Sequence, residues 1–170
     1  MAASAYCRAA IAIIFLLGAV STLRAQDPDV HSHASEPNPP SPLAVPLDET
    51  ALAALPRTAV IVTEHGKTLT CAGVSLSALL TQAGALSAEP RDGPALASYV
   101  LVTARDGYRA VYSLAELEPT LGNHKALLVD RCEGKPLSDD DGPLRLIAPE
   151  ESRPARWVRQ VHSITVVAAP

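Results

Sequence analysis

The chain has 170 residues, which is enough for one domain, and carries a net charge of −4. Hydrophobic residues make up 48% of the sequence but aromatic residues only 4%, so its core has to be built mainly from Ala, Leu and Val. The acidic balance argues against nucleic acid as a partner, because a phosphate backbone is bound by a basic face.

The N-terminus has the features of a secretory signal peptide. Arg8 supplies a short positive region, residues 9–20 form an apolar run, and Ala25 is the predicted last residue before cleavage. The apolar run is too short to cross a ~30 Å hydrocarbon core comfortably. We therefore predict a signal peptide over residues 1–25 and a periplasmic or secreted mature protein. An uncleaved membrane anchor is the alternative.

Residues 26–46 are predicted to be a disordered, proline-rich linker that precedes a domain over residues 47–170. The linker prolines are Pro28, Pro37, Pro39, Pro40, Pro42 and Pro46. Polar residues between them leave too little apolar surface to offset the entropy lost on ordering. His31 and His33 lie in this segment, and two histidines without a third ligand are expected to be solvated.

The first half of the domain is predicted to contain two helices and two strands. Residues 47–55 predict a short helix capped by Asp48, and the β-branched segment 58–63 predicts a buried strand. A turn at residues 64–67 leads to a second strand at 68–71. Leucines at helical spacing predict a helix over 74–83, with Ser75 as its N-cap and Gly84 as its end.

Strands dominate the second half. Residues 98–104 and 109–113 flank an Asp106-Gly107 dipeptide, which is a strong hairpin signal. A short helix follows at 114–117, with Ser113 and Glu116 in capping-box positions. Further strands are expected at 125–130, 144–148 and 163–167, and residues 156–161 as a helical turn or an extended approach. The predicted class is α+β, with a mixed or largely antiparallel sheet and short helices.

The mature chain would retain two cysteines, Cys71 and Cys132, because Cys7 leaves with the signal peptide. An even number of cysteines in an oxidising compartment favours a disulfide. That bridge would close a loop of about 60 residues and contribute ~4 kcal/mol in the chain-entropy model. Two separate, small buried residues are the alternative interpretation.

An ordered set of short motifs resembles the molybdopterin-binding domain of sulfite-oxidase-type oxidoreductases, and more closely its short, exported, stand-alone form. The resemblance covers about residues 47–167. The motifs, in chain order, are Leu47-Asp48-Glu49, Leu55-Pro56, Gly73-Val74 with Leu76, Leu79, Leu80 and Ala83-Gly84, Asp106-Gly107-Tyr108, Gly134 with Pro136-Leu137, Gly142-Pro143-Leu144-Arg145-Leu146 with Pro149, and Arg156-Trp157-Val158.

The resemblance implies a mixed, largely β sulfite-oxidase-type molybdopterin-binding fold with short helices. In the full-length enzymes a cysteine thiolate ligates molybdenum, since this metal needs a soft sulfur ligand. The resemblance places that cysteine just after the strand at 59–63, where this chain has Glu64 and His65. Cys71 is the only nearby candidate for a displaced metal ligand.

Clustered arginines are the candidates for binding the pterin phosphate, because guanidinium binds phosphate in a bidentate way. We take Arg145, Arg153 and Arg156 as the cofactor-binding candidates, with Arg159 beside them. The alternative is a solvated edge with one cation–π pair on Trp157.

No catalytic residue can be assigned from the sequence. His65, His124 and His162 are scattered, and the adjacent Asp139, Asp140 and Asp141 are expected to be solvated. Two functions are therefore carried forward. The first is a molybdopterin-binding redox protein with a redox or membrane partner. The second is an inert relative, or an accessory module, that binds a small ligand or a partner on the same fold.

Overall fold

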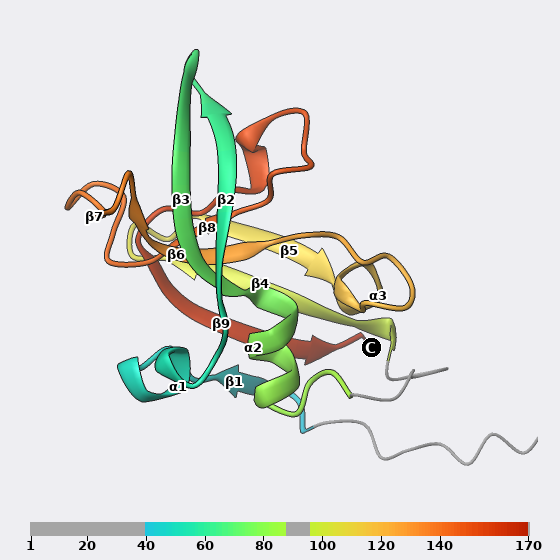
Figure 1. Ribbon diagram of the computed structural model, residues 1–170. Helices are drawn as coiled ribbons and strands as arrows, with labels where there is room; N and C mark the ends of the chain where they lie inside the picture. The colour runs from blue at the N-terminus through green and yellow to red at the C-terminus, as the bar shows by residue number, and fades with distance from the viewer. Residues whose placement is uncertain (1–39, 88–95, 170) are drawn as a thin grey trace, which may run out of the picture. The chain divides into compact units, whose positions relative to one another are not determined.

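The computed structural model describes residues 40–87 and 96–169 (Figure 1). The predicted signal peptide and residues 26–39 of the predicted linker lie outside these ranges. No helix within the described ranges is long and apolar enough to cross a membrane. Every strand pair is antiparallel, which confirms the predicted, largely β, α+β class.

One sheet has four strands in the order β1-β9-β4-β5. Its strands are β1 (Leu43–Val45), β9 (Val161–Ala168), β4 (Ser98–Ala104) and β5 (Arg109–Ser113). Alternate residues of β4 are buried, as expected for a strand with one face on the core. The turn between β4 and β5 has Gly107 at φ 87°, so the Asp-Gly hairpin prediction is confirmed.

The second sheet has the order β2-β3-β6-β7, and β8 also pairs with β6. Its strands are β2 (Arg57–Glu64), β3 (Lys67–Ser75), β6 (Leu127–Cys132), β7 (Lys135–Pro136) and β8 (Arg145–Ile147). In Figure 1 the outer part of the β2–β3 hairpin extends away from the other strands. The hairpin turns at His65 and Gly66, which have φ angles of 49° and 75°.

Three short α-helices and the 3₁₀ helix η2 lie between these strands in the described ranges. They are α1 (Glu49–Ala53), α2 (Leu76–Gln82), α3 (Leu114–Leu117) and η2 (Pro154–Arg156). Asp48 caps α1 by accepting a hydrogen bond from the Ala51 N–H, and the Ser113 N–H donates to Glu116 at 2.8 Å. Ser75 is the N-cap residue of α2, as predicted, but its side chain makes no capping hydrogen bond, and its hydroxyl pairs with the Ser77 hydroxyl at 2.8 Å.

The core is aliphatic, as the composition requires. The larger of two buried clusters includes Leu76, Leu80, Tyr112 and Ile164, which come from α2, β5 and β9. The smaller cluster lies under the second sheet and includes Val62, Cys71 and Ile147.

The folded domain begins earlier than the sequence predicted. Leu43–Val45 fall within the predicted linker, but they pair with Ile164–Val166 of β9. The Ser41 hydroxyl also accepts a hydrogen bond from the Ala168 N–H at 2.9 Å. The predicted start of the domain after Pro46 is therefore wrong for residues 43–45. The composition of this segment does not favour order, but pairing with β9, more than a hundred residues along the chain, makes it a strand.

The register between β3 and β6 shifts between Ala72 and Gly73, and the backbone of β6 lies close to Gly73. A Cβ built on Gly73 would overlap the backbone carbonyl of Leu128. We predict that Gly73→Ala lowers the free energy of unfolding by about 3 kcal/mol, because the backbone of β6 has to move. The matched control is Ala72→Ser, which adds one heavy atom at the residue that precedes Gly73. Urea unfolding of both variants tests this, and equal stability of the two would contradict it.

Candidate functional site

The end of β2 is held against β8 by a buried ion pair. Arg145 is 4% exposed, and its Nη2 lies 2.7 Å from Oε1 of Glu64. The Glu64 side chain is itself only 12% exposed. A charged group this deep in a domain is normally paired, because desolvation is otherwise costly.

Two further charged side chains complete what we call the Arg145 cluster, defined as Glu64, Asp141, Arg145, Trp157 and Arg159. Arg159 lies 3.6 Å from Glu64 and 3.2 Å from Asp141. Arg145 Nη1 lies 3.4 Å from Asp141. The cluster therefore sets two guanidinium groups against two carboxylates, so its formal charges cancel.

Trp157 packs beside this cluster. The Arg145 guanidinium lies 5.6 Å from the centroid of its ring, and the indole N–H donates to the Ala148 carbonyl at 2.9 Å. This confirms a cation–π pair on the tryptophan. The Nε of Arg145 is buried and has no hydrogen-bond partner among the described residues.

The Arg145 guanidinium lowers the pKa of Glu64 below its ordinary value. The hydrogen bond to Arg145 is the largest cause, and burial opposes it by disfavouring the charged form. The Glu64 side chain is thus an ionised carboxylate, and the guanidinium groups of Arg145 and Arg159 are already its partners.

A second group, the Arg156 cluster, consists of Tyr112, Glu116, His124, Glu151 and Arg156. Arg156 lies 2.7 Å from Glu151 and 3.0 Å from Glu116, and its guanidinium lies 4.2 Å from the centre of the Tyr112 ring. One arginine faces two carboxylates here, so the cluster carries a net negative charge when His124 is neutral.

Three groups of the Arg156 cluster have a shifted pKa or a polar atom without a partner. Burial, followed by the Glu151 charge, raises the pKa of Tyr112. Burial alone would lower the pKa of Arg156, but its bonds to Glu116 and Glu151 raise it. His124 lies between Glu150 and Glu151, at 3.5 and 3.6 Å, and its buried Nε2 has no hydrogen-bond partner in the described part of the chain.

The three predicted cofactor-binding arginines lie in three different settings. Arg145 is buried in one cluster and Arg156 is paired in the other, whereas Arg153 is exposed on the loop before η2. Arg153 forms no ion pair within the described residues. Binding of a pterin phosphate by these arginines stays a prediction, but two of the three already have carboxylate partners.

The two cysteines lie opposite each other on β3 and β6 and form a disulfide. The alternative of two separate buried residues is therefore wrong. Cys71 as a metal ligand stays a prediction that would require this bond to be reduced, because a disulfide sulfur is not a thiolate. Elsewhere in residues 40–87 and 96–169, no group of three His, Cys, Asp or Glu side chains is placed to hold a metal ion.

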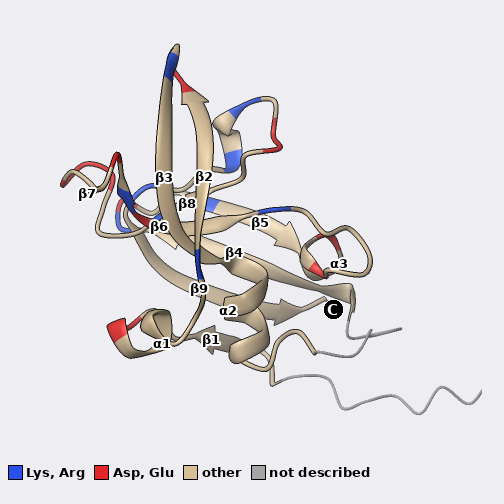
Figure 2. Ribbon diagram, in the orientation of Figure 1, with Lys and Arg blue, Asp and Glu red and all other residues tan. Residues whose placement is uncertain are grey.

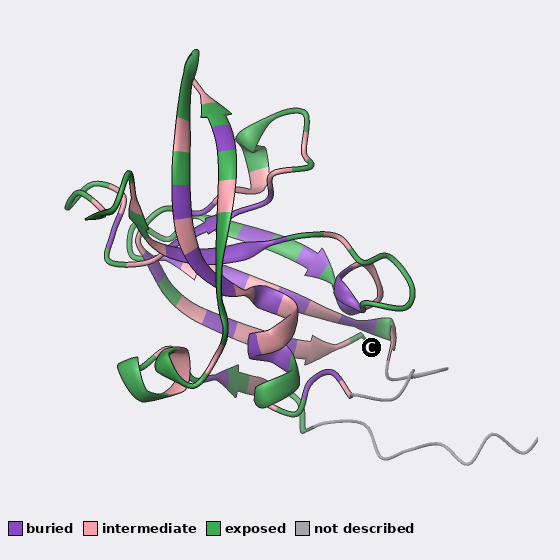
Figure 3. Ribbon diagram, in the orientation of Figure 1, coloured by how far each residue is buried: buried purple, intermediate pink, exposed green. Residues whose placement is uncertain are grey.

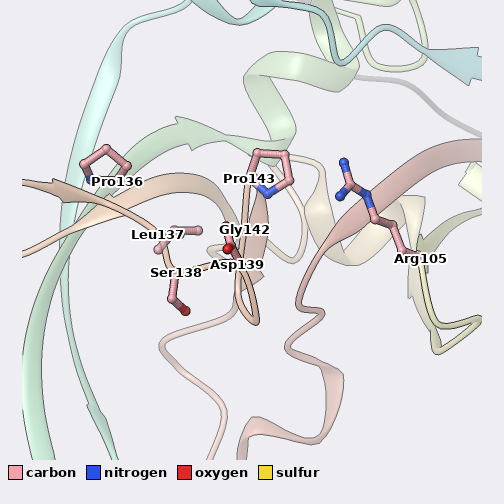
Figure 4. Close-up of a pocket in the computed structure, with 7 residues that line it drawn as sticks. All are labelled: Arg105, Pro136, Leu137, Ser138, Asp139, Gly142 and Pro143. Carbon is pink, nitrogen blue, oxygen red and sulfur yellow. The ribbon is translucent and has the colours of Figure 1, made fainter.

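A cavity of about 310 Å³ lies where the segment after β7 faces the β4–β5 turn (Figure 4). Its lining combines a basic side chain with apolar and short polar ones. The lining residues are Arg105, Pro136, Leu137, Ser138, Asp139, Gly142 and Pro143. The turn that carries Asp139 also carries Asp141, so the cavity borders the Arg145 cluster.

Sequence reasoning found the arginines of both clusters but missed their partners. Glu64 was noted only as a residue that stands where a cysteine was expected, and Glu151 was not singled out. The feature of the sequence that could have identified Glu64 is a carboxylate at the end of a strand whose inner face is apolar. Such a group needs a cation from another part of the chain.

Residues 56–170 match the family described as the oxidoreductase molybdopterin binding domain. The match covers more than half of the chain and includes every strand from β2 to β9. No curated protein matches the sequence.

The lowered pKa of Glu64 makes stability depend on pH in the acid range. Because the folded-state pKa is depressed, this stabilisation is complete above the ordinary value of 4.5 and is lost as the pH falls through the lower folded value. We expect Glu64→Gln to lower the free energy of unfolding at pH 7 by about 2 to 3 kcal/mol. The variant should also show a flatter loss of stability in acid.

Asp140→Asn is the control for this prediction, since Asp140 is exposed and forms no ion pair within the described segments. Urea denaturation at a series of pH values measures both effects. A Glu64→Gln curve that runs parallel to that of the parent chain at every pH would contradict the assigned role of the pair.

Proposed function

The chain belongs to the oxidoreductase molybdopterin-binding domain family, and from that premise we propose that it is an exported member which uses the fold as a binding module and not as a redox enzyme.

The observation that carries the proposal is the ion pair between Glu64 and the buried Arg145. The family resemblance places the molybdenum-ligating cysteine just after the strand that became β2, and Glu64 is the last residue of β2. Its carboxylate oxygen is a hard donor and is bound by Arg145 at 2.7 Å. The Glu64 carboxylate is therefore not a soft ligand as a thiolate is, and its pairing with Arg145 leaves it less accessible to a metal.

Other sulfur ligands do not substitute for the missing one. Cys71 is 1% exposed and bonded to Cys132. Breaking that bond would free a thiol at the centre of β3, seven residues from the end of β2. The donor atoms of the described chain therefore do not fit a molybdenum centre of this family.

Two of the three candidate arginines, Arg145 and Arg156, do not fit the pterin phosphate either. The Arg145 cluster is neutral as a whole, and the Arg156 cluster has a negative formal balance. A phosphate entering either cluster would have to displace a carboxylate from its arginine. Neither cluster therefore offers an unpaired positive charge to a phosphate.

What the fold retains is a scaffold for binding. The cavity beside Pro143 has the mixed apolar and polar lining of a small-ligand site, with Arg105 as its basic group. The disulfide supports export, because such bonds persist in oxidising compartments such as the periplasm or the extracellular space.

The second candidate function is molybdopterin binding with a changed set of ligands. It is favoured by the family match itself, since the matched family is named for that cofactor. Metal and pterin content separate the two candidates.

We predict that the protein purified from the exported fraction of a molybdenum-replete host contains neither molybdenum nor pterin. Elemental analysis measures the metal, and fluorescence of the oxidised pterin measures the cofactor. A thiolate-containing sulfite-oxidase-type enzyme from the same host is the positive control. Stoichiometric molybdenum in this protein would overturn the proposal, and Cys71→Ser would then show whether that sulfur is the ligand.

Export makes a separate prediction. Signal cleavage after Ala25 would leave Gln26 as the first residue of the mature protein, which N-terminal sequencing or intact-mass measurement detects. Replacing Ala25 by Arg should abolish cleavage, and a conservative Ala25→Ser should not. Retention of Met1 in the purified wild-type chain would contradict a cleaved signal.

A further inference from the structure

The edge of the second sheet at β2 lacks the usual protection against pairing with another strand. β2 is eight residues long and lies at the end of the strand order. Its six interior residues, 58–63, contain no charge, proline or glycine. Backbone hydrogen bonds from residues 57–64 reach no partner other than β3 within the described ranges.

The other sheet edges are each short or covered. β1 has three residues, and β7 has two, one of which is Pro136. On β5 the Val111 carbonyl accepts a hydrogen bond from the Arg156 side chain at 3.2 Å. Short length, proline, charged side chains and covering groups are the devices that keep edge strands from pairing, and residues 58–63 of β2 have none of them.

The outer face of the β2–β3 hairpin is uncharged and partly apolar. Ile61 is 70% exposed, more than any other large hydrophobic side chain in the described ranges. It lies on the face of Ala59 and Thr63, and Thr70 is its partner on β3. Figure 2 shows charged residues near the tip and base of the hairpin, and Figure 3 shows the exposed positions that alternate along β2.

Hairpin geometry determines which backbone groups of β2 are open. The two-residue turn makes Glu64 and Lys67 the closing pair, and hydrogen bonding alternates from there along the strands. The N–H and C=O groups of Ala59, Ile61 and Thr63 therefore point away from β3. The residues whose backbone groups are unpaired are therefore also the residues whose side chains are exposed.

We infer that β2 is a homodimer interface, in which two copies pair antiparallel along this edge with Ile61 against Ile61. A two-fold axis perpendicular to the sheet preserves its faces, so only side chains of the same face can lie opposite each other. Pairing centred on Ile61 then sets Ala59 opposite Thr63 and Val60 opposite Val62. It uses residues 58–64 and leaves out Pro56, which has no N–H to donate.

The charges at the ends of β2 are compatible with this pairing. Its first residue is Arg57 and its last is Glu64, so antiparallel copies bring the basic end of one beside the acidic end of the other. No two like charges lie directly opposite in the paired segment, where Glu64 faces Thr58. A second copy thus fits this edge in side-chain shape, hydrogen bonding and charge.

The oligomeric state of the purified full chain tests the interface. We expect sedimentation to show a concentration-dependent monomer–dimer equilibrium, which Ile61→Lys weakens at least about tenfold because two lysines would face each other. Leu121→Lys and Val111→Lys are matched controls, since these side chains are 55% and 48% exposed but lie elsewhere. Neither control should change the equilibrium.

Cysteine cross-linking tests the register. Ile61→Cys should form an intermolecular disulfide under mild oxidation, because residue 61 faces itself. Thr63→Cys should cross-link no more than the parent chain, because residue 63 faces Ala59. The parent chain, which retains Cys7 where the signal is not removed, gives the background.

Three results would overturn the inference. They are a wild-type chain that stays monomeric at millimolar concentration, controls that dissociate the dimer as strongly as Ile61→Lys, and equal cross-linking at positions 61 and 63. The content of molybdenum or pterin does not enter these measurements, so the dimer and the proposed function fail independently.

Discussion

A buried guanidinium is the constraint on which much of this structure depends. Arg145 lies in β8 at 4% exposure, and a cation at that depth must be matched by nearby carboxylates. Glu64 comes to it from the end of β2, and Asp141 from the turn before β8. Meeting this single requirement attaches a hairpin to the rest of the sheet and fixes the turn that borders the cavity. It also occupies the end of β2, beside the position where the sulfite-oxidase-type resemblance predicts a cysteine.

The family fold is held by interactions that are independent of any cofactor. The strands that match the family are held by aliphatic packing and antiparallel pairing, and neither of these needs a cofactor. The backbone pairing of the sheets does not specify which side chains stand at the strand ends, but a charge placed there, such as Glu64, needs a partner of opposite charge. Here those ends carry carboxylates that pair with Arg145 and Arg156.

Local patterns predicted most of the fold because local physics determines it. The β-branched run in β2, the Asp106-Gly107 turn and the Glu116 capping contact all appear where the sequence placed them. β1 was missed because its order comes from β9, far along the chain. The candidate site was predicted less well for the same reason: the arginines are visible in the sequence, but only the folded chain shows that Glu64 and Glu151 are their partners.

Trp157 is the only tryptophan, and its position has a spectroscopic consequence. Its ring contacts both the Arg145 guanidinium and the small cluster that contains the Cys71–Cys132 bond. Indole emission depends on the surroundings of the ring, so the emission of the native protein should change when the packing of this cluster or the Arg145 ion pair is disturbed. The tryptophan fluorescence of this molecule therefore reports on one place, where the segment after β8 packs against the second sheet. It does not report an average over the whole fold.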